Sequence, residues 1–339
     1  METSPTTRDQ YHEEHYVSRV VEEEQILQAL NGRTGSSIVT IIGPTGYGKT
    51  WLLHQLQSQL RATYKDAIFV WIDLRDLCLR AKSTEDFFLQ LSYRLIEPLA
   101  ERDKIMAASS SKHATAVSRF VNLMRNILNF HVGEYILTLD PGDGALGQPF
   151  QDDFYLALRA CIEAGSQTES RSRPWRKLRL ILTTSYPRTF LSTALANSPF
   201  NIGTGVEISK FTAEQTQQLA VGFGIYFDSY EQRHIQQLLG GHPALLNQCL
   251  SYVIHHNIAL RTLLDDVSIQ RIVFCRYLDS TYQQLRKAPA LIQALHALSK
   301  NPKAGLSLDT EARLYSLGLI ETTSAGRQVC RDLDRILLA

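Results

Sequence analysis

The sequence predicts an α/β fold, with a parallel sheet in the first two thirds, then a helical region and a small C-terminal winged helix. Four apolar, β-branched segments alternate with helical patterns up to about residue 210. Beyond Phe211, apolar residues recur at helical spacing in one segment after another. The last fifty or so residues follow the order helix, helix, two-stranded hairpin, which is the outline of a winged helix.

The composition is that of an ordinary globular chain. It has 339 residues, 44% hydrophobic and 20% charged, with a formal net charge of +1. Such a charge creates no overall field that would draw the protein onto nucleic acid or an anionic membrane. Five cysteines without a CxxC pair indicate neither a disulfide framework nor a zinc site. The apolar runs are too short to span a bilayer and the polar N-terminus carries no apolar core of a signal peptide, so we expect a cytoplasmic protein with no membrane partner.

The first part of the chain supplies the predicted sheet. We expect a flexible N-terminus over residues 1–15 and an α/β domain over residues 16–210. The strands are expected over residues 36–42, 67–74, 134–140 and 178–185. Helices are expected over residues 20–30, from Lys49 to about Leu60 and from Ser83 to about Ala100. Two more are expected after residue 114, one ending at about Phe130 and one over residues 152–164.

The second part is predicted as a helical lid domain over residues 211–286 and a winged-helix domain over residues 287–339. Thr212 and Gln215 have the spacing of a capping box, which marks the start of a helix. Further helices are expected over residues 231–239, 244–254 and 290–298. A hairpin that turns at Ser324–Gly326 is expected after them.

The segment "GPTGYGKT" after the first strand fits the Walker A pattern G-x-x-x-x-G-K-T. Its glycines let the backbone approach phosphate oxygens, and the following helix N-terminus attracts anions. Lys49 would reach the β- and γ-phosphates, and the Thr50 hydroxyl would bind Mg²⁺. The alternative is a glycine-rich turn with a surface lysine. The motif predicts ATP or ADP with Mg²⁺ as cofactors, bound by Gly43, Pro44, Thr45, Gly46, Tyr47, Gly48, Lys49 and Thr50.

Two further strand ends carry candidate catalytic residues. The third strand ends in Asp140, where a Walker B aspartate would hold Mg²⁺ through water, unless it only caps the turn before Pro141. The fourth strand ends in Thr183, Thr184 and Ser185. A hydroxyl there, Thr184 in particular, could sense the γ-phosphate or orient the attacking water; a plain strand-end threonine is the alternative.

These segments together resemble a known family. With "LDPGD", "PWRKLRLILTTS", "NSPFNIGTGVEISKFTAEQ" and "LLGGHPALLNQ", the chain resembles the bacterial AAA-like members of the STAND class of signalling ATPases over residues 16 to 335. The resemblance implies a P-loop NTPase core, a small helical lid and a winged helix that close over ATP or ADP.

The resemblance also implies nucleotide contacts outside the Walker A segment. The turn Gly241–His242–Pro243 would lie in the lid, with Pro243 packed on the nucleotide and His242 able to contact phosphate; a simple loop-to-helix junction is the alternative. Arg19 falls where the family places a residue of its N-terminal nucleotide-contact segment, with a solvated arginine as the alternative.

The sequence departs from the family where water would be activated. The family commonly has a glutamate after the Walker B aspartate, but here that position is Pro141, with Asp143 as the nearest carboxylate. The arginine usual after the fourth strand is also missing, since Ser185 follows Thr184. The chain is therefore a candidate ATPase for which we predict nucleotide binding with slow or absent hydrolysis.

We accordingly predict a nucleotide-dependent switch and oligomerisation platform in signalling or defence. It would form a homo-oligomer in the ATP state and act through a partner or effector chain. The alternative is a DNA-associated AAA+ ATPase of the replication or transposition type, using the winged helix and the basic segment 171–179 around Trp175. Nucleic acid is less favoured, because "DTEARLYSLGLI" carries only one cation beside two acids, and because Trp175 could instead be tucked against the sheet edge.

Overall fold

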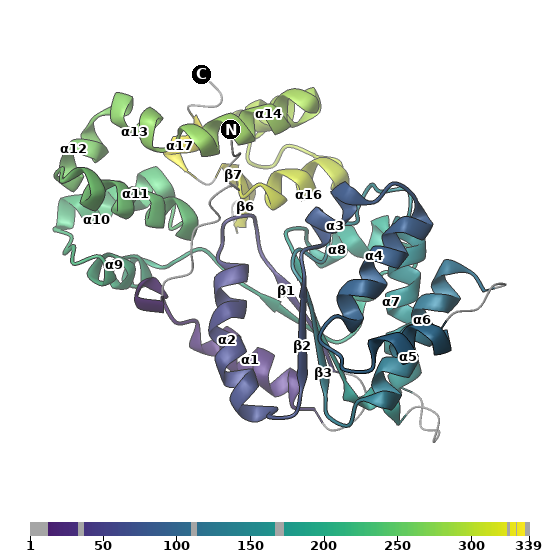
Figure 1. The fold of residues 1–339 in the computed structure, drawn as a ribbon. Helices are drawn as coiled ribbons and strands as arrows, with labels where there is room; N and C mark the ends of the chain where they lie inside the picture. The colour runs from purple at the N-terminus through teal and green to yellow at the C-terminus, as the bar shows by residue number, and fades with distance from the viewer. Residues whose placement is uncertain are drawn as a thin grey trace, which may run out of the picture. The chain divides into compact units, whose positions relative to one another are not determined.

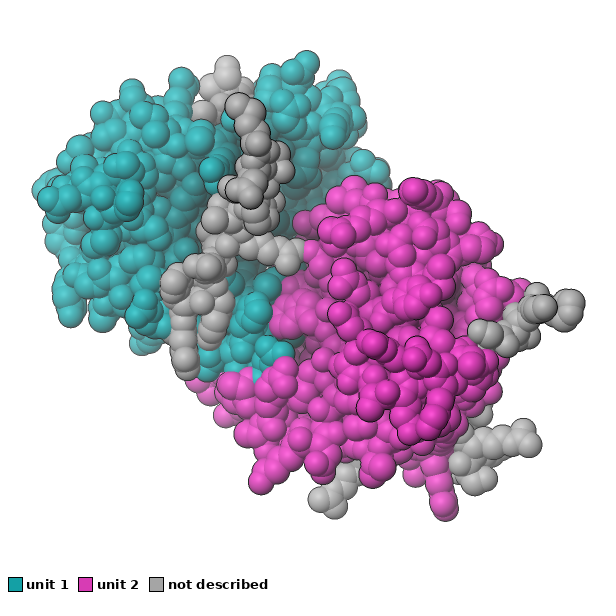
Figure 2. Space-filling model, viewed as in Figure 1, with its two compact units in different colours: residues 1–19, 44–57, 209–339 teal, residues 20–43, 58–208 magenta. Residues whose placement is uncertain are grey.

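The computed structural model describes residues 13–32, 37–109, 114–166, 173–323, 326–329 and 331–335. The chain forms two compact units, shown in different colours in Figure 2. We call residues 20–43 and 58–208 the sheet unit, and residues 1–19, 44–57 and 209–339 the helical unit. The Walker A segment from Pro44 onward therefore groups with the C-terminal helices. The four-part division predicted from the sequence stays a prediction.

The sheet unit contains, within the described residues, one five-stranded parallel sheet in the order β2-β3-β4-β1-β5. Its strands are β1 (Ser37–Ile42), β2 (Ile68–Ile72), β3 (Tyr135–Leu139), β4 (Leu178–Thr184) and β5 (Thr204–Glu207). The four predicted strands and the α/β fold are confirmed. The sequence did not predict β5, because "TGVE" has only Val206 buried and offers no apolar run.

Helices connect the strands, as parallel pairing requires. Those of the sheet unit are α1 (Val20–Leu30), α3 (Leu74–Arg80), α4 (Thr84–Ile96), α5 (Arg102–Ser109), α6 (Ala116–Phe130), α7 (Gln151–Ser166) and α8 (Arg188–Ala194). Two short 3₁₀ helices also occur: Pro174–Lys177 directly precedes β4, and Pro199–Asn201 precedes β5. Ser83 caps the start of α4 as expected, because its hydroxyl accepts the Asp86 N–H at 3.1 Å.

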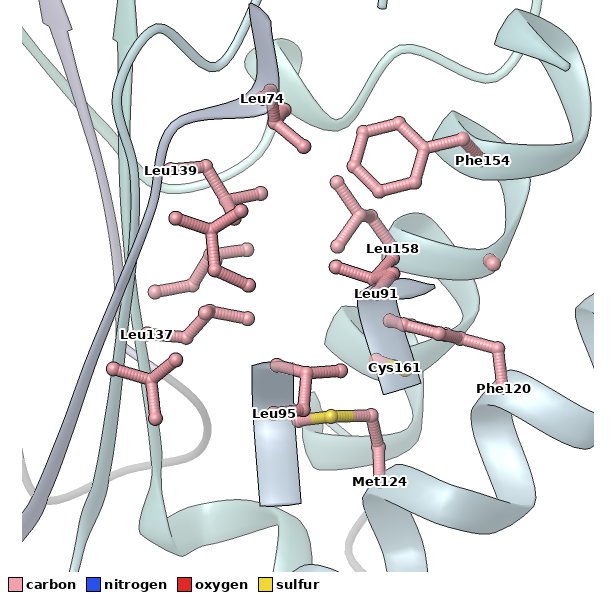
Figure 3. Close-up of a cluster of buried hydrophobic side chains, with 14 of the residues drawn as sticks. Leu74, Leu91, Leu95, Phe120, Met124, Leu137, Leu139, Phe154, Leu158 and Cys161 are labelled. Carbon is pink, nitrogen blue, oxygen red and sulfur yellow. The ribbon is translucent and has the colours of Figure 1, made fainter. Parts of the chain in front are cut away.

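The core of the sheet unit lies between the sheet and helices α4, α6 and α7 (Figure 1). Figure 3 shows side chains of these helices pointing toward Leu137 and Leu139 of β3. The alternate residues of the strands, such as Ile41 and Ile181, are also buried, so both faces of the sheet are covered. The residues of α4, α6 and α7 labelled in Figure 3 are Leu91, Leu95, Phe120, Met124, Phe154, Leu158 and Cys161.

The helical unit is built from short amphipathic helices. They are η1 (Glu13–His15), α9 (Ala213–Gly222), α10 (Ser229–Leu239), α11 (Pro243–His256), α12 (Leu260–Asp265), α13 (Val267–Val273), α14 (Cys275–Lys287), α15 (Pro289–Lys300), α16 (Leu308–Ser316) and α17 (Asp332–Arg335). The predicted capping box of Thr212 and Gln215 opens α9 and is confirmed. The N-terminal segment predicted to be flexible lies outside the described residues, except that residues 13–15 form η1, where His15 stacks on Phe223 at 3.9 Å.

Two strands near the C-terminus form the predicted hairpin, β6 (Ile320–Thr323) paired antiparallel with β7 (Gly326–Val329), and residues 324–325 of its predicted turn lie outside the described residues. One ion pair attaches it to a helix, with Arg327 2.6 Å from Glu311 of α16, and a second joins it to the segment before α9, with Lys210 2.6 Å from Glu321. The order α15, α16, hairpin follows the predicted outline, and its assignment as a winged helix stays a prediction. None of the described helices combines the length and apolar character needed to cross a bilayer.

Candidate nucleotide-binding site

The Walker A segment starts at Gly43, directly after β1. The Gly43 N–H donates to the carbonyl of Thr184 in β4 at 3.1 Å, which fixes the point where the chain leaves the sheet. A Cβ atom at Gly43 would lie 2.5 Å from Cγ1 of Ile208, so only glycine fits there. This position is therefore explained by close packing inside the sheet unit.

The remainder of the Walker A segment belongs to the helical unit. Gly46 and Gly48 have φ values of +80° and +91°, a region that other residues rarely adopt, so the glycines at these positions are required. Lys49 begins α2 (Lys49–Thr63), and its ammonium donates to the Pro44 carbonyl at 2.9 Å. The first turn of α2 carries no acidic side chain. A glycine-rich turn leading into a helix N-terminus with a lysine and Thr50 fits a phosphate group bound with Mg²⁺.

His242 joins α11 to this loop. It is the N-cap of α11, and its Nδ1 accepts the Leu245 N–H at 3.3 Å. Because Nδ1 accepts, the proton of the neutral ring lies on Nε2, which donates to the Thr45 carbonyl at 3.1 Å. Burial, followed by the nearby charge of Arg331, holds the pKa of His242 well below its ordinary value. Both ring nitrogens thus bind protein groups, and the expected contact with phosphate stays a prediction.

Two backbone hydrogen bonds add to this connection. Helix ends leave N–H and C=O groups without partners in their own helix. The Ala244 N–H, in the first turn of α11, donates to the Gly46 carbonyl at 3.1 Å. At the C-terminal end of α16, the Ser316 carbonyl accepts the Thr45 N–H at 2.9 Å. The backbone of the Walker A loop therefore forms hydrogen bonds with the ends of two different helices of the same unit. Pro243 occupies the first turn of α11, as expected for a proline.

Arg19 lies against the same loop. Its guanidinium donates from Nη2 to the Tyr47 carbonyl at 3.1 Å and stands 4.9 Å from the centre of the Phe211 ring. The side chain is buried, so it is not a solvated arginine. The Phe211 N–H in turn donates to the Gly241 carbonyl at 2.7 Å. The structure thus brings together Arg19 and the turn that contains His242 around one loop, and the nucleotide contact expected of Arg19 stays a prediction.

A buried polar cluster near His242 was not found by sequence reasoning. Nε of Arg331 donates to the Asp334 carboxylate at 2.6 Å, and Nη2 donates to the Tyr277 hydroxyl and to the Gly318 carbonyl, both at 2.7 Å. Burial raises the pKa of Asp334, and Arg331 works against that rise. The Tyr277 ring lies 6.2 Å from that of His242. No local pattern could have revealed these residues, because arginine and aspartate are usually exposed.

The sheet unit carries the other candidate residues at the carboxyl ends of β3 and β4. The Thr183 hydroxyl donates to Oδ1 of Asp140 at 2.6 Å. The Thr184 hydroxyl donates to Oδ2 of Asp143 at 2.8 Å, and the same oxygen accepts the Ser185 N–H at 2.7 Å. Asp140 and Asp143 therefore each pair with a different threonine of β4. The roles expected for Thr184 and Asp143 in handling water stay predictions.

The basic segment around Trp175 has a structural role in the described residues 173–179. Trp175 is buried, so its ring does not offer a stacking surface. Lys177 donates to the carbonyls of Leu128 and His131 at the end of α6, at 3.0 and 2.7 Å. Arg179 is buried and donates to the Arg176 carbonyl. This arrangement supports the alternative in which the segment packs against the sheet.

Solved structures show the same fold. The Walker-type ATPase PABY2304 of Pyrococcus abyssi is similar over 98% of both chains, with a TM-score of 0.68 and 14% identity. The ORC2 protein of Aeropyrum pernix, in its ADPNP-ADP complexes, is similar over 94% of this chain and 91% of that chain, with a TM-score of 0.50 and 14% identity. A weaker similarity, with a TM-score of 0.43 and 19% identity, is to the STAND protein PH0952 of Pyrococcus horikoshii, over 95% of this chain and 42% of that chain.

At these identities the similarities indicate the fold and not the activity. No curated protein matches this sequence. A family model described as an AAA-like domain matches residues 4–335, nearly the whole chain. With a Walker A segment leaving a parallel sheet and a helical C-terminal region, this chain belongs to the family of AAA-like domains.

Proposed function

We propose that this ATPase-like domain is a nucleotide-dependent switch of the STAND type, which binds ATP or ADP with Mg²⁺ at the Walker A segment. Lys49 would bind the β- and γ-phosphates, and Thr50 and Asp140 would hold Mg²⁺, Asp140 through water. Bound Mg²⁺ would neutralise phosphate charge. The positive φ angles at Gly46 and Gly48 and the helix that begins at Lys49 support this assignment.

The observation that carries the switch is the set of hydrogen bonds between the Walker A loop and helices α11 and α16. The loop accepts from His242 and Ala244 and donates to Ser316. A phosphate group that binds the loop acts on the same short backbone segment that these helices hold. A ligand shifts a conformational equilibrium only through differential affinity. The hydrogen bonds couple the conformation of the loop to the position of the helices. Nucleotide that binds the loop would therefore have a different affinity for each arrangement of the helices.

The proposed output is a change in self-association. The ATP-bound form would assemble with further copies of the chain and act on a partner or effector chain in signalling or defence. Slow hydrolysis suits this role, since it would leave each nucleotide state long-lived. No described feature favours the DNA-associated alternative, because Trp175 is buried and Lys177 binds backbone carbonyls.

The test combines nucleotide binding with hydrodynamics. A fluorescent ATP analogue should bind the wild-type protein in Mg²⁺, and the variant Lys49→Ala should not bind it. Light scattering after size exclusion should give a different mass or radius in ADP and in a non-hydrolysable ATP analogue, and Lys49→Ala should lose that difference. Equal binding by both proteins would refute the nucleotide site. Unchanged mass and radius in both nucleotides would refute the switch and leave a static nucleotide site.

A further inference from the structure

We propose that Thr183 is the residue of β4 that positions Asp140 for Mg²⁺, and that Thr184 acts with Asp143 as a structural pair only. From the sequence we expected Thr184, the second of these adjacent threonines, to be the functional one. The inference rests on the proposed nucleotide site and assigns two further roles within it.

The contact between Thr183 and Asp140 is short and partly buried. The Thr183 side chain is fully buried, and its hydroxyl donates to Oδ1 of Asp140 at 2.6 Å. Hydrogen bonds to an ionised carboxylate are shorter and stronger than neutral ones. A β-branched side chain on a strand has a restricted χ1, so the hydroxyl is held in place by the sheet. Thr183 therefore limits the rotation of the carboxylate that Mg²⁺ would use.

The backbone strengthens the same contact. The Gly142 N–H donates to the Thr183 carbonyl at 2.7 Å, and the Asp140 N–H donates to the Ile72 carbonyl at 3.0 Å. A Cβ atom on Gly142 would lie 2.9 Å from the Thr183 carbonyl oxygen, so the close approach needs glycine. The chain that follows β3 is thus attached to Thr183 by both its backbone and a side chain. Backbone hydrogen bonds thus hold the chain at Asp140 itself and again at Gly142, two residues later.

The hydroxyl of Thr184 hydrogen-bonds to Asp143 and not to Asp140. A threonine hydroxyl has one proton to donate. That proton goes to Oδ2 of Asp143 at 2.8 Å, while the Thr184 oxygen accepts the Tyr186 N–H at 3.0 Å. The same carboxylate oxygen also takes the Ser185 N–H. Thr184 thus has no second proton for a phosphate or a water, and Asp143 serves as an acceptor for the turn after β4.

Thr183 has likewise given its only proton to Asp140, so it acts through that carboxylate and is a positioning residue. Loss of a residue that orients a metal ligand typically lowers metal affinity 10- to 100-fold. In the variant Thr183→Val, we expect the factor by which Mg²⁺ raises ATP affinity to fall about ten-fold or more. Binding measured in EDTA should stay unchanged, because Thr183 acts on the metal side. The conservative variant Thr183→Ser should restore the gain.

The matched control is Thr184→Val on the neighbouring residue. It should lower the thermal unfolding midpoint, because Asp143 loses a buried donor, and should keep the wild-type gain from Mg²⁺. Affinity for the fluorescent ATP analogue would be measured for the full chain, with Mg²⁺ and with EDTA, in wild type and each variant. If Thr183→Val does not fold, Thr183→Ala takes its place.

The outcomes separate this inference from the proposed function. A wild-type protein that binds no nucleotide in either condition overturns both. A wild type with a Mg²⁺-dependent gain that Thr183→Val retains overturns the role of Thr183 alone. A gain lost in Thr184→Val and kept in Thr183→Val reverses the assignment. Loss in Thr183→Val, recovery in Thr183→Ser and retention in Thr184→Val support it.

Discussion

The imidazole of His242 donates from Nε2 to the Thr45 carbonyl, 3.1 Å away, while its Nδ1 accepts the N–H of Leu245. The first bond reaches the Walker A loop and the second caps α11. One neutral ring in one tautomer serves both. Gly46 leaves room for this ring, because a Cβ atom there would lie 2.3 Å from its Cε1.

We expect His242→Ala to destabilise the protein by about 2–4 kcal/mol, because it removes a helix cap and a loop contact and leaves a cavity. His242→Asn is the matched variant, since its shorter side chain can still cap α11 but loses the bond to Thr45. It should cost less than the alanine variant. Urea unfolding followed by circular dichroism measures both. Equal stability of His242→Ala and wild type would show that the ring contributes nothing to holding the helix.

The depressed pKa of His242 predicts a loss of stability at mildly acidic pH. Its neighbours are Arg331, Lys49, Tyr47 and Tyr277, and the two cations oppose protonation along with burial. The unfolded chain then binds a proton near its ordinary pKa while the folded chain does not, so stability falls as pH drops below about 6.5. This one group should cost about 1.4 kcal/mol between pH 7.5 and pH 5.5, starting from an unfolded pKa of about 6.5.

The non-titrating variant His242→Asn supplies the control for this effect. Unfolding free energies of wild type and variant would be compared at both pH values. The wild-type protein should lose more stability on acidification than the variant, by about that amount. Identical losses in the two proteins would place the pH dependence in other groups.

Gly241 should tolerate no side chain. It has a φ of +75°, and a Cβ atom would lie 2.2 Å from the Phe211 carbonyl oxygen. Gly224 has a similar φ of +71°, but a Cβ atom there meets no heavy atom within 4 Å. Gly224→Ala should therefore cost only the backbone penalty of about 1–2 kcal/mol. Gly241→Ala should cost about 2 kcal/mol more than that, and equal thermal midpoints would contradict the clash.

The ion pair of Arg331 with Asp334 should matter far more than an exposed pair of the same type. Its side chains are 1% and 2% exposed, against 50% and 55% for Arg313 with Asp309. Asp334→Asn would leave a buried guanidinium without its counter-charge, so we expect a loss of about 3–5 kcal/mol. Asp309→Asn should cost under about 1 kcal/mol. Chemical denaturation of the two variants checks the difference, and similar losses would refute a role for burial.

The sequence predicted what depends on short stretches of chain. Four strands, the Walker A segment and the caps at Ser83 and Thr212 follow from local chemistry, and each is found. The strand β5 was missed, because its pairing with β1 and not its own apolar content makes it a strand.

Contacts between distant segments were not predictable. Nothing in the residues around Ser316 indicates that its carbonyl accepts the N–H of Thr45. The choice between Thr183 and Thr184 likewise depends on which one faces Asp140 across the sheet. Register, which is fixed by the pairing of β3 with β4, decides this, and a single sequence does not reveal it.

ATP hydrolysis by this protein should be slow, at about 0.1 s⁻¹ or less against an enzyme median of about 10 s⁻¹. Pro141 follows Asp140, the predicted Walker B aspartate, and has no carboxylate to orient water. The nearest candidate, Asp143, accepts from Thr184 and Ser185 through one oxygen. Loss of a positioned catalytic group costs orders of magnitude in rate.

The measurement is steady-state phosphate release, with Lys49→Ala as background. The variant Asp143→Asn is decisive, because its amide oxygen can still accept from Ser185. If Asp143 is structural, the residual rate per folded molecule should be unchanged in this variant. A wild-type rate near 10 s⁻¹ that falls a hundredfold in Asp143→Asn would show that this aspartate replaces the missing glutamate.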